Sequence, residues 1–203
     1  MRISFLKSDC PPPSFNLNGH DLKCVNHIKL LGVTLQDNLK WEMHIHDIVA
    51  KACRRLYTLI ILKKAKAPSK DLLQVYTCYI RPLVEYACPV WHSSITKDQT
   101  KSIERIQKRA LRIIYGMNYV SYESALKLSD LPSLVNRRVQ LLLKFGKGII
   151  KSDTFRSILP PVRDISRTLR SASKPLLKIP FGRTERFRSS PVPFLVRLIN
   201  DEY

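Results

Sequence analysis

The fold of this chain is decided by the stretch from Lys97 to Tyr115, KDQTKSIERIQKRALRIIY. Its apolar residues recur at intervals of three and four, the spacing that places side chains on one face of an α-helix. These residues are Ile103, Ile106, Ala110, Ile113 and Ile114. Thr96 is a suitable N-cap before the stretch, and Gly116 is a suitable residue to end the helix after it. The sequence therefore predicts an amphipathic helix that buries one face in a core.

The residues on either side of this helix have the same periodicity. A serine N-cap at Ser69 is expected to begin one helix, and Pro82 is expected to kink or restart it. Apolar spacings of three and four predict further helices over residues 41–66, 122–128 and 134–150. Residues 39–151 are therefore predicted to form a helical bundle.

The first 38 residues have the features of strands. Residues 2–6 alternate between apolar and polar, and Asn18-Gly19 separates two short apolar runs, as in a hairpin with a type I′ turn. Residues 28–35 predict one further strand, in which Gly32 allows a close approach of backbone. The predicted fold class is α+β, mainly α, with a short antiparallel β element before the helical bundle.

The last part of the chain, residues 152–203, has little periodicity. It contains the proline pair at 160–161, scattered arginines and serines, and one apolar patch at 193–196. We expect a poorly ordered basic tail there. The predicted division of the chain is therefore 1–38, 39–151 and 152–203.

Charge gives the first indication of function. Lys and Arg number 35 against 16 Asp and Glu, a net charge of +19 spread along the chain. Such an excess is typical of proteins that bind a polyanion, and nucleic acid is the partner we expect. The candidate phosphate contacts on helix 97–115 lie off its apolar stripe, and a second helix adds an arginine pair. These residues are Lys101, Arg105, Lys108, Arg109, Arg112, Arg137 and Arg138. A merely solvated helix face is the alternative.

Other side chains that could carry chemistry fit structural roles better. Tyr76, Tyr79, Tyr86 and Trp91 could stack on bases, but their helical spacing favours the core. In the sequence His44-Ile45-His46-Asp47 the two histidines are two residues apart. They face different directions on a helix and are not expected to share a metal.

Catalytic motifs are absent from the sequence. No two aspartates are adjacent, so the pair that holds the two metals of nucleotidyl transfer is missing. Phosphate-binding-loop, serine-hydrolase and zinc-peptidase motifs are also absent. We predict no catalytic residue, no metal site and no cofactor in this chain.

Three strings point to a family. They are KLLGVTLQDNLKWEMHIHDIVAKACRRLY, YIRPLVEYACPVWHSS and IERIQKRALRIIYG, and in this order they resemble the region after the catalytic aspartates in reverse transcriptases of non-LTR retrotransposons (long interspersed elements of the jockey and chicken-repeat kind). The start of the chain, MRISF, is similar to the second half of a palm strand. The final segment from Ser190 to Asn200 is similar to the end of such reading frames.

The resemblance implies a separate role for each part of the chain. Residues 1–38 would be residual palm strands, 39–151 a helical thumb, and Leu31-Gly32-Val33 the part that grips the primer. The partners it implies are the template–primer duplex, held by its backbone, and a palm and fingers that lie upstream. The parent enzyme would use magnesium. We therefore expect a truncated fragment of an RNA-directed DNA polymerase that grips the duplex and is inactive alone.

Two alternatives remain open. The first is a stand-alone basic module that binds nucleic acid. The second follows from a further resemblance of residues 1–46 to a short module named after AlkB-type tRNA-modifying oxygenases, although the His-x-Asp that such chemistry needs is missing.

The sequence also bears on location. No signal peptide is seen, the longest apolar run is too short to span a bilayer, and the five cysteines form no C-x-x-C pair. We expect an intracellular chain with reduced thiols and no membrane partner.

Overall fold

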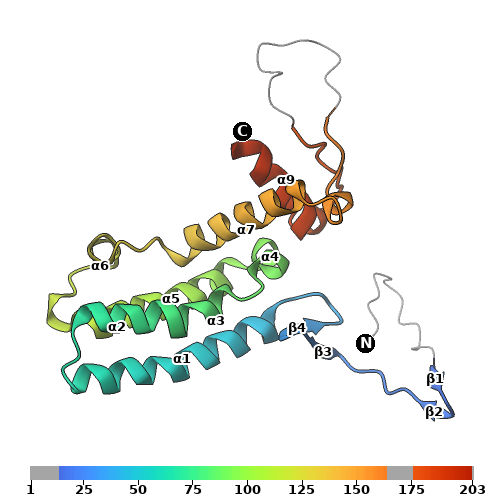
Figure 1. The fold of residues 1–203 in the computed structure, drawn as a ribbon. Helices are drawn as coiled ribbons and strands as arrows, with labels where there is room; N and C mark the ends of the chain where they lie inside the picture. The colour runs from blue at the N-terminus through green and yellow to red at the C-terminus, as the bar shows by residue number, and fades with distance from the viewer. Residues whose placement is uncertain (1–13, 164–175, 203) are drawn as a thin grey trace, which may run out of the picture.

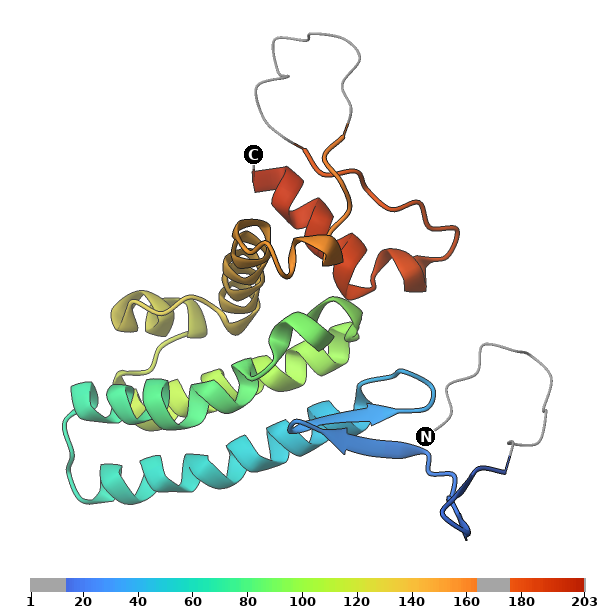
Figure 2. The ribbon, with the colours of Figure 1, turned by 45° about the vertical axis from the view of Figure 1, so that its right-hand side comes forward.

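The computed structural model describes residues 14–163 and 176–202, and the strand predicted over residues 2–6 lies outside them. The chain is mainly helical with two small antiparallel strand pairs, which confirms the predicted α+β, mainly α class. Figures 1 and 2 show α1 (Glu42–Lys64), α5 (Lys97–Tyr115) and the helices between them lying side by side, with α7 (Leu134–Lys151) crossing above.

The second long helical segment of the bundle is nearly continuous. It consists of α2 (Ser69–Val75), a π-helical turn (Tyr76–Ile80) and α3 (Arg81–Glu85). Pro82 lacks an N–H and its ring crowds the carbonyl four residues earlier, and a wider π turn just before it relieves this conflict. The N-cap predicted at Ser69 is wrong by one residue. Pro68 occupies that position, and the Ser69 hydroxyl lies 3.4 Å from the carbonyl of Ile114.

A sharp turn then leads to the centre of the bundle. Ala87 has a left-handed backbone (φ 50°) and precedes the short helix α4 (Cys88–Trp91), which is followed by a 3-10 turn (His92–Ser94) and α5. After α5 come a 3-10 turn (Gly116–Asn118), α6 (Tyr122–Ser129) and α7. The helices predicted over 41–66, 97–115, 122–128 and 134–150 are confirmed within a residue or two.

The C-terminal part differs from the predicted extended tail. A 3-10 turn (Arg156–Ile158) and α8 (Glu185–Arg188) lead to α9 (Pro191–Glu202), which packs against α7. The two helices approach so closely that a Cβ on Gly146 would lie 2.8 Å from Ile199. The Asn200 side chain also bonds both backbone groups of Leu177 at 2.9 Å. Buried Leu195, Val196 and Ile199 explain why this end is folded onto the bundle.

The β element consists of two hairpins. The Asn18-Gly19 hairpin is confirmed, with strands β1 (Asn16–Leu17) and β2 (His20–Asp21) and positive φ at both turn residues. The single strand predicted over 28–35 is wrong. It is a second hairpin of β3 (His27–Leu30) and β4 (Val33–Gln36), because Leu31 and Gly32 both take positive φ and turn the chain.

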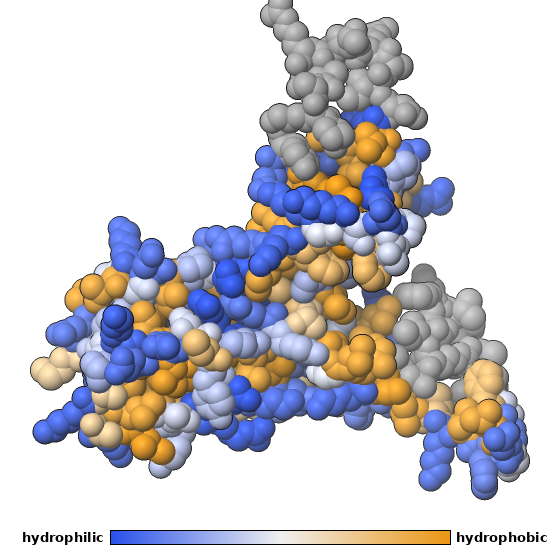
Figure 3. Space-filling model, in the orientation of Figure 1, coloured by the Kyte–Doolittle hydropathy of each residue, from blue (hydrophilic) through white to orange (hydrophobic). Residues whose placement is uncertain are grey.

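One hydrophobic core connects these elements. It extends from Val33 in β4 through the bundle helices to Ile199 in α9. The largest fully buried side chains include Trp91, Tyr76 and several leucines and isoleucines of α1, α2 and α5. In contrast, every residue of β1, β2 and β3 is exposed, and Figure 3 shows hydrophobic residues at the surface around the β3–β4 hairpin.

Candidate nucleic-acid interface

Helix α5 is fixed at its beginning and along its inner face. The Thr96 side chain accepts a bond from the Gln99 backbone at 3.2 Å, and the Gln99 side chain accepts one from the Thr96 backbone at 2.8 Å, a capping box. Buried Gln107 accepts a bond from the Tyr76 hydroxyl at 2.6 Å and donates one to the Pro132 carbonyl at 2.8 Å. These bonds set the rotation of α5, so its outer face is determined by the fold.

The acid nearest to the cations of α5 is turned inwards. One carboxylate oxygen of Glu104 accepts bonds from the Tyr122 hydroxyl and, at 3.1 Å, from the backbone N–H of Leu134. Burial and the bond to Glu104 raise the pKa of Tyr122, so its hydroxyl stays a donor. Glu104 is thus used to join α5 to α6 and α7 and leaves the charge of the outer face uncompensated.

The predicted cations of α5 do share an exposed face. All five are exposed, and within residues 14–163 and 176–202 only Lys101 has an ion pair, a solvent-exposed one with Asp98 at 3.4 Å. Two of the other side chains lie against aromatic rings. Lys108 Nζ is 4.8 Å from the centre of the Tyr122 ring, and the Arg112 guanidinium is 5.3 Å from that of Tyr119. These cations keep their full charge toward solvent.

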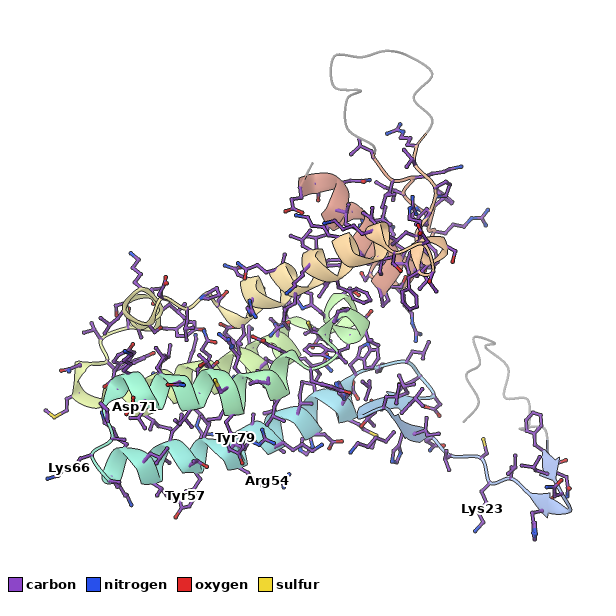
Figure 4. All side chains as sticks on the ribbon, in the orientation of Figure 1. Lys23, Arg54, Tyr57, Lys66, Asp71 and Tyr79 are labelled. Atoms are coloured by element: carbon purple, nitrogen blue, oxygen red, sulfur yellow. The ribbon has the colours of Figure 1, made fainter. Side chains whose placement is uncertain are left out.

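The positive face continues onto α1. Arg109 Nη1 lies 3.6 Å from Cys53 Sγ, which places Arg109 at the seam between the two helices. Lys63 Nζ donates to the Ile114 carbonyl at 2.7 Å near the end of α5. Arg54 is exposed and, with Tyr57, points away from the bundle along α1 in Figure 4. We refer to Lys101, Arg105, Lys108, Arg109 and Arg112 as the α5 basic face.

The arginine pair of α7 does not belong to this face. Arg137 is half-buried and its Nε lies 3.3 Å from Glu85, a carboxylate that it shares with Arg81 at the same distance. Arg138 is fully buried at 0% exposure, so the prediction that it contacts phosphate is wrong. Successive residues of a helix point about 100° apart, and at this position of α7 that rotation turns Arg138 into the core and Arg137 toward Glu85.

Buried Arg138 has a structural role. Its Nε donates to Nδ1 of His92 at 3.1 Å, and its guanidinium lies 5.8 Å from the centre of the Trp91 ring. Burial, and then the charge of Arg138, lower the pKa of His92 to about 4. The neutral imidazole can therefore accept this bond at ordinary pH, and the bond connects α7 to the 3-10 turn that follows α4.

Of the grip-like residues, Leu31 and Gly32 form the β3–β4 turn and Val33 begins β4. Leu31 is 84% exposed and Val33 is buried. Tyr86 holds the turn, because its hydroxyl donates to the Leu31 carbonyl at 2.8 Å and its ring would lie 3.2 Å from a Cβ on Gly32. The close approach at Gly32 is thus made by a side chain, whereas a backbone approach was expected. The helical spacing favoured a core position for Tyr86, and its bond to Leu31 had no local signal because the two residues are distant in sequence.

The remaining candidates are structural or solvent-exposed. Tyr76 and Trp91 are core residues as predicted, whereas Tyr79 and Tyr86 are exposed. The Arg55 guanidinium covers the Tyr79 ring at 4.2 Å. His44 is buried and accepts a bond from the Thr34 backbone at 3.3 Å, while His46 is exposed, so the two do not converge. No group of three possible metal ligands occurs within the described ranges.

Comparison with protein-family models, with curated proteins and with solved structures found no match for this chain. In the part of the chain that the structure describes, none of the helices has the length and apolar content needed to cross a bilayer.

Proposed function

We propose that this chain binds a nucleic-acid duplex by its phosphate backbone, with the α5 basic face as the principal contact. The observation that supports this most is the lack of a charge partner for four cations of this face, which are Arg105, Lys108, Arg109 and Arg112. They have no carboxylate within 4.0 Å among the described residues, although they crowd one side of a rigid helix. Like charges at such spacings repel one another, and phosphates placed opposite them remove the repulsion.

The length of the α5 basic face matches a segment of a duplex phosphate backbone. From Lys101 to Arg112 the helix rises about 16 Å, a length over which one strand of B-form duplex carries about five phosphates. Backbone contacts of this kind carry no sequence information. The expected ligand is therefore a duplex of any sequence.

We further propose that the chain serves as the thumb-like part of a reverse transcriptase of the non-LTR kind that it resembles. The turn at Leu31 and Gly32 lies where the resemblance puts the primer grip, and Tyr86 gives it a fixed position. The exposed apolar side chains of the hairpins, among them Leu17, Ile28 and Leu30, support a further segment that covers them, as a palm would. In this role the duplex is an RNA–DNA hybrid.

A stand-alone binding module is the second candidate. It is favoured by the continuous core from β4 to α9, because a chain with a core of its own can fold without a palm. A primer-extension assay does not distinguish the two candidates. We expect no extension from this chain with magnesium or manganese, because it lacks the pair of aspartates that binds these metals. An upstream coding sequence that contains adjacent aspartates would favour the polymerase fragment, and its absence would favour the module.

The test of duplex binding is a salt titration of the full chain. Four phosphate contacts predict that log K falls with log salt with a slope of about −3.6, at about 0.9 per contact. The slope should be similar for unrelated duplex sequences. A flat response, or no binding at low salt, would show that the positive charge serves another partner.

A further inference from the structure

Two apolar side chains protrude beyond the C-terminal end of α5. Met117 is fully exposed and is the most exposed large hydrophobic residue in the described part of the chain, and Val120 is 86% exposed. We call these two residues the apolar tip. The backbone beneath the tip is held in place, because Tyr119 N–H bonds the Gly116 carbonyl at 3.1 Å and the Ser121 side chain caps α6. Single exposed hydrophobic residues are common, so the tip alone implies nothing.

Cations lie close to the residues that flank the tip. A Cβ on Gly116 would lie 3.9 Å from the side-chain methylene of Lys63, and Arg112 covers the ring of Tyr119. Lys64 and Lys66 are exposed at the same end of the bundle, where Figure 4 shows Lys66 at the turn between α1 and α2. Asp71 is the acidic residue labelled nearby, and no ion pair joins it to these lysines.

The tip therefore ends the α5 basic face with an apolar group. A duplex strand that follows the face from Lys101 to Arg112 reaches Met117 and Val120 next. Proteins that open or cap stacked bases use one or two apolar side chains, methionine among them, while neighbouring cations hold the phosphates. Stable attachment to a membrane needs more buried apolar surface than two side chains supply. Nucleic acid is thus the partner that the arrangement favours.

We propose that Met117 and Val120 pack on an exposed base face, at the end of a duplex or at a break in one strand. This inference rests on the proposed duplex binding and names the kind of nucleic acid that the site prefers. The interior of an intact duplex shows no base face. The chain should therefore bind ends and gaps in preference to uninterrupted duplex.

The test uses the full chain and short duplexes that carry 2-aminopurine at the terminal pair, beside a one-nucleotide gap or in the intact interior. Binding should change the fluorescence of the terminal and gap probes and leave the interior probe unaltered. The double variant Met117→Ala/Val120→Ala should lose this change. It should also bind open-ended duplex about tenfold more weakly, the effect of losing roughly two buried methylene groups. Its salt slope should equal that of the parent.

A matched control is Ile158→Ala/Ile179→Ala, which removes two exposed aliphatic side chains from the C-terminal part of the chain. This control should behave as the parent does. The parent can bind duplex with a steep salt slope while the tip variant shows the same affinity and the same change in 2-aminopurine fluorescence. In that case the tip proposal is wrong and the proposed function stands. If the parent binds no duplex, both are wrong. If the tip variant instead loses only binding to phosphatidylserine vesicles, the tip is a membrane contact and the proposal is overturned.

Discussion

Three of the five cations of the α5 basic face can be removed without a change in the core. Arg105, Lys108 and Arg112 are exposed, and alanine has the highest helix propensity, so Arg105→Ala/Lys108→Ala/Arg112→Ala should keep the helical content. The folded chain loses two exposed cation–π contacts, worth about 0.5–1 kcal/mol each. A small fall in Tm is therefore expected, and circular dichroism should report an intact fold.

The loss of duplex binding should be large. Each phosphate contact contributes about 0.9 to the salt slope, so three lost contacts reduce the slope by about 2.7. At 0.1 M salt the same three contacts correspond to about 2.7 log units in K, or roughly 500-fold, if all of them are made. Fluorescence anisotropy at several salt concentrations measures both quantities.

The control must remove the same charge elsewhere. Lys144→Ala/Lys151→Ala/Lys178→Ala also lowers the net charge by three, and these lysines are exposed and outside α5. The control should retain most of the affinity and the slope of the parent. Equal losses in the two triple variants would refute the assignment, because the binding would then follow net charge and the α5 basic face would be only a solvated surface.

Three further predictions concern the core. Ile106→Asp should unfold the bundle, with a cost of more than about 3 kcal/mol, because it puts an unpaired carboxylate at a position that is 1% exposed; circular dichroism should show lost helix. Arg138→Ala should cost about 3 kcal/mol or more in urea unfolding because it leaves a cavity at a position that is 0% exposed, Arg138→Met should cost less because it fills that space, and neither should change the salt slope of duplex binding. His92 has a pKa of about 4 in the folded chain, against 6.5 for an ordinary histidine, so it is protonated more readily in the unfolded chain. The free energy of unfolding should therefore be highest above about pH 6.5 and fall by roughly 2 kcal/mol towards pH 4. His92→Gln should show a weaker loss over that pH range.

The helices were predictable because their apolar spacing is regular. In α5 the stripe predicted from Ile103, Ile106, Ala110 and Ile114 is buried, while Ile113 is only half-buried at its edge. Gln107 shares the buried face, which hydropathy cannot indicate, since its amide is satisfied by two partners that are distant in sequence. Periodicity thus predicts the face of a helix, and long-range hydrogen bonds decide its polar members.

The errors have local physical causes. Arg137 and Arg138 look alike in the sequence, but the helix turns one toward Glu85 and the other into the core beside Trp91. The turn at Leu31 was missed because a leucine at positive φ is uncommon, and the bond from Tyr86 that supports it comes from another element.

The C-terminal helix was missed for a different reason. Residues 193–196 were interpreted as an isolated apolar patch in an extended tail, whereas they lie in the first turns of α9, where proline is well tolerated. Its apolar residues find their partners on α7, so the helix depends on tertiary packing that the local pattern does not reveal.

The central claim is that duplex phosphates lie against the α5 basic face, and lysine footprinting tests it most directly. Acetylation of the chain with and without a saturating duplex, followed by peptide mass spectrometry, measures the reactivity of each lysine. Lys101 and Lys108 should be protected by the duplex, while Lys144, Lys151 and Lys178 stay reactive. Unchanged reactivity at Lys101 and Lys108, with protection of the other three, would contradict the claim and place the contact on the C-terminal part of the chain.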